Sequence, residues 1–307
     1  MKYKGVMCLM KNAVILFVYN RPQHTQRVIE GLKKNHIEKL YVFSDGAAKE
    51  VDQQLVNDTR NLIKNIDWCE VEAVYHTNNK GLAESVINGV TQVFSKGYER
   101  VIVLEDDCVP NENFVSFMNS AFDYYENDDE IMHVSGFGLP INKYTNSDTY
   151  FTPYPCSWGW GTWSKYWKEC DFYQHSAYKE LLENEVDIKK FNYAGQAFSA
   201  FLEAQIQGKV NSWLIRWYYH IFINNGKCVW SYESLIKNKG FDGTGAHKVK
   251  YDRFNQKNIC VNKSEFVFEN NKKINSKLIK EFRRYFIGRS MTEKIKTILY
   301  QLTGLIV

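Results

Sequence analysis

The sequence lacks the cysteine pattern of a disulfide-stapled or zinc-binding protein. Its seven cysteines are scattered and odd in number, and no two of them form a CxxC pair. Neither a disulfide framework nor a thiolate metal site is therefore expected. Long apolar runs are missing too, because Val14–Tyr19 is far too short to span a bilayer. These absences predict a protein of the reducing cytosol.

Repeats, low-complexity tracts and Pro- or Gly-rich linkers are also absent. The 307 residues are 44% hydrophobic and 15% aromatic, which is enough to bury a large core. We therefore expect one continuous fold and not two independent domains.

Positive charge is concentrated at the end of the chain. The net charge is +4, but residues 271–307 contain nine Lys or Arg against two Glu, which leaves about −3 on the remainder. A body of this charge is not expected to bind nucleic acid.

The first half of the sequence alternates strand and helix patterns. Apolar strands are expected at Ala13–Asn20, Lys39–Gly46, Val71–His76 and Val101–Leu104. Apolar residues at three- and four-residue spacing mark amphipathic helices between and after them, namely Val28–Leu32, Leu55–Ile63, Leu82–Phe94 and Phe114–Tyr125. This order predicts an α/β fold with a mixed, mainly parallel sheet covered by helices on both faces.

Three consecutive carboxylates, Glu105, Asp106 and Asp107, follow the fourth predicted strand. Ligands of open α/β sheets bind beyond the carboxyl ends of strands. Adjacent carboxylates repel one another, and Mg²⁺ or Mn²⁺ would compensate them. The alternative is a solvated acidic turn before the next helix.

The stretch VIVLEDDCVPNENFVSFMN resembles the acidic DXD-type motif of GT-A nucleotide-sugar glycosyltransferases, in particular N-acetylglucosaminyltransferase I and its bacterial polysaccharide-assembly relatives. The resemblance extends over about Ala13–His247. It implies a GT-A (Rossmann-like) fold, a Mn²⁺ or Mg²⁺ cofactor and a UDP-sugar donor.

The resemblance implies roles for several strand-end residues. In YNRP, Arg21 matches a nucleotide contact, and in FSDG, Asp45 matches the aspartate that reads uracil. Lys80 of NNKGLAESV matches a cation on the phosphate side. In the acidic motif, Asp107 is the expected metal ligand, while Asp106 would face the ribose or sugar and Glu105 would line the donor site.

Two further segments resemble parts of this family. YPCSWGWGTWSKYWK is similar to its aromatic segment, and this likeness places Trp158 and Trp160 at the acceptor sugar, with core packing as the alternative. NKGFDGTGAHK resembles a loop that orders over the diphosphate, where His247 would contact the metal or a phosphate unless it is structural. The implied parts are a donor half at 1–135, an acceptor and catalytic half at 136–265, and a tail at 266–307.

The position of the catalytic base departs from the family pattern. NSWLIRWYY matches the segment that supplies a carboxylate to inverting transferases, but it places Asn211 there, and an amide cannot accept the proton. Glu203, Asp242 or Asp171 could serve instead. The register could also differ, the mechanism could be retaining, or the chain could be a catalytically silent sugar- or nucleotide-binding homologue. A nucleotidyltransferase is a further alternative, but YNRPQHT lacks the glycines of its phosphate loop.

The tail predicts a membrane contact through residues 277–307. Two apolar stripes there, starting at Leu278 and Met291, are flanked by Lys and Arg, as in helices that lie on anionic membranes. The alternative is a helix packed on the body or on another subunit. The expected protein is a glycosyltransferase, peripheral on the inner face of the cell membrane. It would move a sugar from a UDP-sugar to a saccharide or lipid-linked saccharide in surface-polysaccharide synthesis, with inversion.

Overall fold

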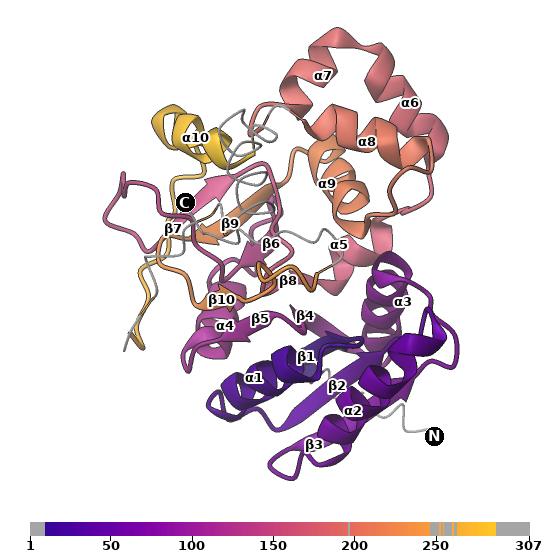
Figure 1. The fold of residues 1–307 in the computed structure, drawn as a ribbon. Helices are drawn as coiled ribbons and strands as arrows, with labels where there is room; N and C mark the ends of the chain where they lie inside the picture. Colours follow the sequence, from indigo (N-terminus) through magenta and orange to yellow (C-terminus); the bar gives the residue numbers. More distant parts are fainter. Residues whose placement is uncertain are drawn as a thin grey trace, which may run out of the picture.

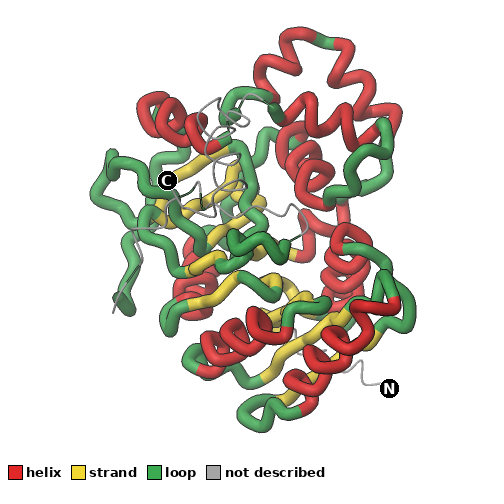
Figure 2. The backbone as a smooth tube through the Cα atoms, in the orientation of Figure 1, coloured by secondary structure: helices red, strands yellow, loops and turns green. Residues whose placement is uncertain are grey.

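The computed structural model describes residues 10–195, 197–245, 252, 254, 260 and 263–286. Its centre is one eight-stranded sheet in the order β3-β2-β1-β4-β8-β6-β9-β7, beside a two-stranded sheet of β5 and β10. Figure 1 shows how the helices surround this sheet, and Figure 2 shows its strands as one band through the molecule. The prediction of an α/β fold with a mixed, mainly parallel sheet is confirmed.

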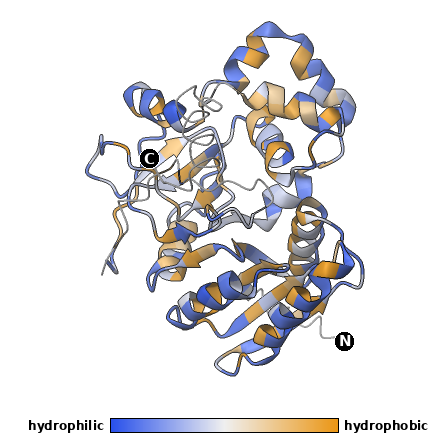
Figure 3. Ribbon diagram, viewed as in Figure 1, coloured by the Kyte–Doolittle hydropathy of each residue, from blue (hydrophilic) through white to orange (hydrophobic). Residues whose placement is uncertain are grey.

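The four expected strands form the parallel half of the sheet. They are β1 (Met10–Val18), β2 (Lys39–Ser44), β3 (Glu70–Tyr75) and β4 (Tyr98–Glu105). The connecting helices are α1 (Pro22–Lys33), α2 (Gln53–Lys64), preceded by η1 (Glu50–Asp52), and α3 (Leu82–Ser95). Each of these helices alternates hydrophilic and hydrophobic stripes, and the apolar stripe packs on the sheet (Figure 3).

The other half of the sheet is mixed. Its strands are β6 (Ile131–Ser135), β7 (Thr149–Thr152), β8 (Trp160–Trp163) and β9 (Lys227–Ser231). β8 joins the two halves because it pairs antiparallel with both β4 and β6. The small sheet pairs β5 (Cys108–Pro110) with β10 (Ile236–Asn238) directly after the acidic triplet, and α4 (Phe114–Tyr124) follows.

A group of helices lies beyond one side of the sheet (Figure 1). Its members are α5 (Ser164–Glu169), α6 (His175–Glu183), α7 (Glu185–Phe191), α8 (Phe198–Ile206) and α9 (Trp213–Ile223). The start of α9 is fixed by Ser212, whose side chain accepts a hydrogen bond from the backbone N–H of Ile215. Helix α9 packs on α3, so the helical group touches the parallel half.

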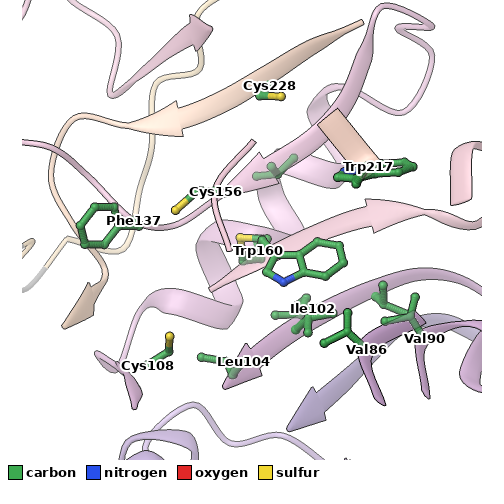
Figure 4. Close-up of a cluster of buried hydrophobic side chains, with 14 of the residues drawn as sticks. Val86, Val90, Ile102, Leu104, Cys108, Phe137, Cys156, Trp160, Trp217 and Cys228 are labelled. Atoms are coloured by element: carbon green, nitrogen blue, oxygen red, sulfur yellow. The ribbon is translucent and has the colours of Figure 1, made fainter. Parts of the chain in front are cut away.

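Trp160 belongs to the core and not to an acceptor surface. Its side chain is fully buried and stacks on Trp213 at 4.6 Å and on His133 at 5.4 Å between ring centroids. Figure 4 shows it in the middle of the buried cluster, near Ile102 and Trp217. The expected contact between Trp160 and a sugar is therefore wrong for this structure, because neither face of its ring is accessible.

The described part of the tail packs on the body. Helix α10 (Ser276–Phe282) and η2 (Arg283–Tyr285) place Leu278 and Phe282 in the core, where Phe282 lies 5.0 Å from the ring of Trp230. This first apolar stripe therefore cannot face a membrane, and the expectation is corrected for it. The second stripe lies outside the described residues. No helix in the described ranges is long and apolar enough to cross a membrane.

Candidate active site at the carboxyl edge of the parallel strands

The carboxyl ends of three neighbouring strands bring the predicted donor-side residues to one edge of the sheet. Arg21 follows β1, Asp45 follows β2, and the acidic triplet of Glu105, Asp106 and Asp107 ends β4. Because the strand order is β2-β1-β4, these ends are adjacent. This is the edge at which open α/β sheets bind ligands.

Arg21 bridges the two aspartates of the triplet. Its Nε donates to Asp106 Oδ2 at 3.2 Å, its Nη2 donates to Asp106 Oδ1, and Nη2 also lies 3.0 Å from Asp107 Oδ2. Burial opposes the charge of Arg21, but Asp106 and Asp107 outweigh it and raise the pKa of its guanidinium. Arg21 therefore supplies positive charge of the kind that the sequence pattern required.

Burial makes the acidic side chains of this edge difficult to ionise. It raises the pKa of Asp106 to about 6, although the charge of Arg21 acts in the opposite direction. Burial and repulsion from Asp107 and Asp106 also raise the pKa of Glu105 well above its ordinary value. A second cation at this edge would therefore be favourable, because it would stabilise the ionised carboxylates.

Asp45 organises the loop before α3. Its Oδ1 accepts from the backbone N–H groups of Gly46 and Lys80 at 2.9 and 2.8 Å, and its Oδ2 accepts from Gly81 at 2.9 Å. Gly81 can begin the helix here because it adopts a φ of 77°. The side chain of Lys80 is exposed beside this loop. Contacts of Asp45 with uracil and of Lys80 with phosphate stay predictions.

The segment after β10 lies directly on the acidic pair. The backbone N–H of Lys239 donates to the carbonyl oxygen of Asp107 at 2.8 Å, and a Cβ at Gly240 would collide with Asp107 Oδ2. Trp158 is partly buried, and the centroid of its ring lies 5.8 Å from that of Phe241, the residue that follows Gly240. Of the two predicted sugar-binding tryptophans, Trp158 is thus the one beside the site.

His24 connects this segment to helix α1. Its Nε2 lies 2.9 Å from Asp242 Oδ2 and 3.2 Å from Thr244 Oγ1, so Asp242 is engaged by an imidazole and not free as a base. The three residues line a hollow of about 350 Å³ together with Arg21 and Arg27. His24 was not identified from the sequence, because its partner is more than 200 residues away. His247 lies outside the described residues.

A second polar cluster lies where α9 meets α3. Arg216 is 4% exposed, its Nη2 donates to Asn211 Oδ1, and its Nη1 lies 3.8 Å from Glu84 Oε1. The hydroxyl of Tyr173 donates to Glu84 Oε2 at 2.7 Å. Asn211 therefore occupies a built polar site, although it cannot act as a base. Glu84 and Arg216 lie within the motifs NNKGLAESV and NSWLIRWYY, but no local pattern in the sequence indicates a role for either.

The other predicted base candidates are elsewhere. Glu203 is exposed on α8 and accepts from Gln207 Nε2 at 3.0 Å. Asp171 is exposed and accepts from the backbone N–H of Tyr173 at 2.8 Å. Among the described contacts, none joins Glu203 or Asp171 to Asp106 or Asp107.

The acidic pair fits a metal that takes only part of its ligands from protein. In the described ranges, no three His, Cys, Asp or Glu side chains are arranged to hold an ion. Mg²⁺ and Mn²⁺ commonly use one or two carboxylates and complete their shell with water and substrate phosphates. Asp106 and Asp107 can supply those carboxylates, and Gly240 lets the backbone after β10 lie directly against Asp107 Oδ2, where a side chain would collide.

The fold is that of the GT-A type of nucleotide-sugar glycosyltransferases. Residues 13–195, which include most of β1, all of β2 to β4 and the acidic triplet, match the family described as glycosyl transferase family 2. The chain belongs to this family. The narrower likeness to N-acetylglucosaminyltransferase I stays a prediction.

Solved structures with similar folds include two of S. aureus TarS, with 17% and 15% identity and TM-scores of 0.38 and 0.44. They align with 53% and 76% of this chain, which spans 50% and 37% of theirs. A mannosyltransferase of Pyrobaculum calidifontis, solved with GDP-Man and Mn²⁺, shares 12% identity over 69% of this chain and 73% of its own, with a TM-score of 0.38. The comparison with curated proteins gave no match.

Proposed function

We propose that the protein transfers a sugar from a UDP-sugar to a saccharide hydroxyl, with inversion and with the help of Mn²⁺ or Mg²⁺. The observation that carries this proposal is the buried pair of Asp106 and Asp107, bridged by Arg21 at the carboxyl edge of the parallel strands. A nucleotide diphosphate is an anionic ligand that both a carboxylate-bound metal and an arginine recognise.

Different residues of this edge would bind different parts of the donor. Asp107, assisted by Asp106, would hold the metal. When bound, the metal supplies positive charge that offsets the negative charge developing on the leaving UDP. Arg21 has one buried nitrogen, Nη1, without a hydrogen-bond partner among the described residues, so it can donate a hydrogen bond to a phosphate oxygen. Asp45 would bind the uracil, and Lys80 would lie on the phosphate side.

The acceptor we propose is a saccharide, free or lipid-linked, in surface-polysaccharide synthesis. The resemblance to bacterial polysaccharide-assembly enzymes and the charge of +7 in residues 271–307 support an enzyme at the inner face of the membrane. The packing of α10 limits any such contact to the residues beyond it.

A calorimetric titration of UDP into the protein with and without Mn²⁺ tests the proposal. We expect Mn²⁺ to lower the Kd for UDP. Asp107→Ala should remove this gain and raise the Kd measured with Mn²⁺ by at least about 100-fold, because replacing even a supporting residue of a metal site typically costs 10- to 100-fold in metal affinity. Asp129→Ala is the matched control, since Asp129 is exposed and its one ion pair among the described residues is with Lys165. UDP binding that ignores Mn²⁺ in the wild type, or a gain that survives Asp107→Ala, would exclude the proposed metal site.

A further inference from the structure

We propose that Glu84, on the first turn of α3, is the general base that takes the proton from the acceptor hydroxyl. This inference rests on the proposed function, since it names the base for that same reaction. It fills the role left open by Asn211, whose amide cannot accept a proton. The cluster of Glu84, Arg216, Tyr173 and Asn211 carries the inference.

Glu84 lies at the same edge of the sheet as the donor site. The loop before α3 is fixed to the end of β2, because Lys80 and Gly81 both donate their N–H groups to the carboxylate of Asp45. Glu84 follows three residues after Gly81, within the first helical turn. The start of α9, where the family pattern places the base, meets α3 at this turn.

The carboxylate of Glu84 is held in place but retains a free acceptor. Its side chain is 31% exposed, and Oε2 accepts one hydrogen bond from the hydroxyl of Tyr173. Oε1 lies 3.8 Å from Arg216 Nη1, which is too long for a hydrogen bond. Arg216 itself lies over the ring of Tyr173, 5.4 Å from its centroid, and this contact helps to hold Tyr173 beside Glu84. An acceptor hydroxyl can therefore reach Glu84 Oε1.

The proposed step is a direct displacement at the anomeric carbon. The acceptor oxygen forms a bond to this carbon, and the bond between the carbon and the β-phosphate oxygen breaks. The electron pair of that bond leaves with UDP. The hydroxyl proton moves to Glu84 and is later released to water, so no further reactant is needed.

The test compares Glu84→Gln with the wild type in the release of UDP from UDP-glucose, UDP-galactose and UDP-N-acetylglucosamine, with water or added saccharides as acceptors. Glutamine keeps the shape and the Tyr173 contact but cannot take a proton. We expect kcat to fall by about 10²–10⁴-fold, the usual contribution of a general base, while the Kd for UDP stays unchanged.

Two further variants separate catalysis from structure. Glu84→Asp keeps a displaced proton acceptor and should retain more activity than Glu84→Gln, whereas a purely structural role would make the two equally harmful. Glu185→Gln is the matched control, because Glu185 also lies on the first turn of a helix but in the outer helical group. It should behave as wild type.

The outcomes distinguish the two proposals. If the wild type turns over a donor and Glu84→Gln has an unchanged kcat, the role of Glu84 is overturned and the proposed function still stands. Loss of UDP affinity in Glu84→Gln would also overturn it, since the residue would then support the donor site. A wild type that releases no UDP from any of the three donors would overturn the proposed function and this inference together.

Discussion

The charged edge of the parallel strands and the aromatic half of the sheet both bury their key side chains but are held together in different ways. At the edge, Asp45 and Asp106 are 7% and 4% exposed, and each carboxylate is bound by named donors, Arg21 or backbone N–H groups. In the other half, Trp160 is fully buried, and its indole Nε1 has no partner among the described residues. Aromatic packing alone holds that ring.

This difference explains why the two regions differ as sources of functional information. Burying a carboxylate costs free energy unless charges and hydrogen bonds compensate it, so such a group is retained where it has a use. Burying an indole ring is favourable in itself. A strand-end carboxylate is therefore a specific indication of a site, whereas a tryptophan in a glycine-rich segment is not.

Replacing Trp160 gives the largest effect that we predict and tests this comparison directly. Trp160→Ala should lower the free energy of unfolding by about 3–5 kcal/mol, the range for removing a fully buried large aromatic side chain. Trp158→Ala should cost less, about 1–2 kcal/mol, because that ring is only partly buried. Urea unfolding followed by far-UV circular dichroism measures both. Equal losses of stability in the two variants, or a folded Trp160→Ala that has lost only its activity toward the acceptor, would contradict the core role of Trp160 and favour a sugar contact.

The regular half of the fold could be predicted from the sequence because its signals are local. The strands and the helical stripes of residues 13–125 follow from apolar periodicity, and strand ends position Arg21, Asp45 and the acidic triplet at one edge. The rest depends on pairs far apart in the chain. Cys108 pairs with Asn238, and His24 meets Asp242, but nothing in either sequence segment indicates its partner.

The group that compensates the negative charge of the acidic residues could likewise not be predicted from the sequence. Repulsion within the triplet required a cation, and a divalent metal was the cation inferred from the sequence. The structure adds that Arg21 already bridges Asp106 and Asp107, which the spacing of 85 residues could not reveal. The expected base was missed for a related reason: Glu84 becomes notable only once α9 packs against α3.

Acid should act on the two regions with opposite sign. His133 is fully buried between Trp160 and Trp217, and burial lowers its pKa to about 3, below its ordinary 6.5. The unfolded chain therefore binds a proton between these values that the folded chain does not, and stability falls by up to about 1.4 kcal/mol per pH unit as the pH drops below 6.5. For Asp106 the folded pKa of about 6 exceeds the ordinary 3.8, so acid stabilises the fold between pH 6 and 4.

Urea unfolding between pH 7 and 5, with a chelator present, separates these two contributions. His133→Gln should remove the destabilisation by acid, so that its stability falls less than that of the wild type. Asp106→Asn should remove the opposing gain, so that its stability falls more. Parallel pH dependences in all three proteins would show that neither group titrates as its burial indicates.

The smallest effect that we predict is at Asn211, just before α9, where the family pattern places the base. If the catalytic base had simply been lost from α9, Asn211→Asp would restore it and raise turnover. Arg216 argues against this, because it is 4% exposed and already donates to the Asn211 oxygen. A carboxylate at this position would form a charge-assisted pair with Arg216 and be a weak proton acceptor. Steady-state release of UDP should therefore change by less than about twofold. An increase of tenfold or more, which corresponds to about 1.4 kcal/mol of transition-state stabilisation, would transfer the role of base from Glu84 on α3 to the start of α9.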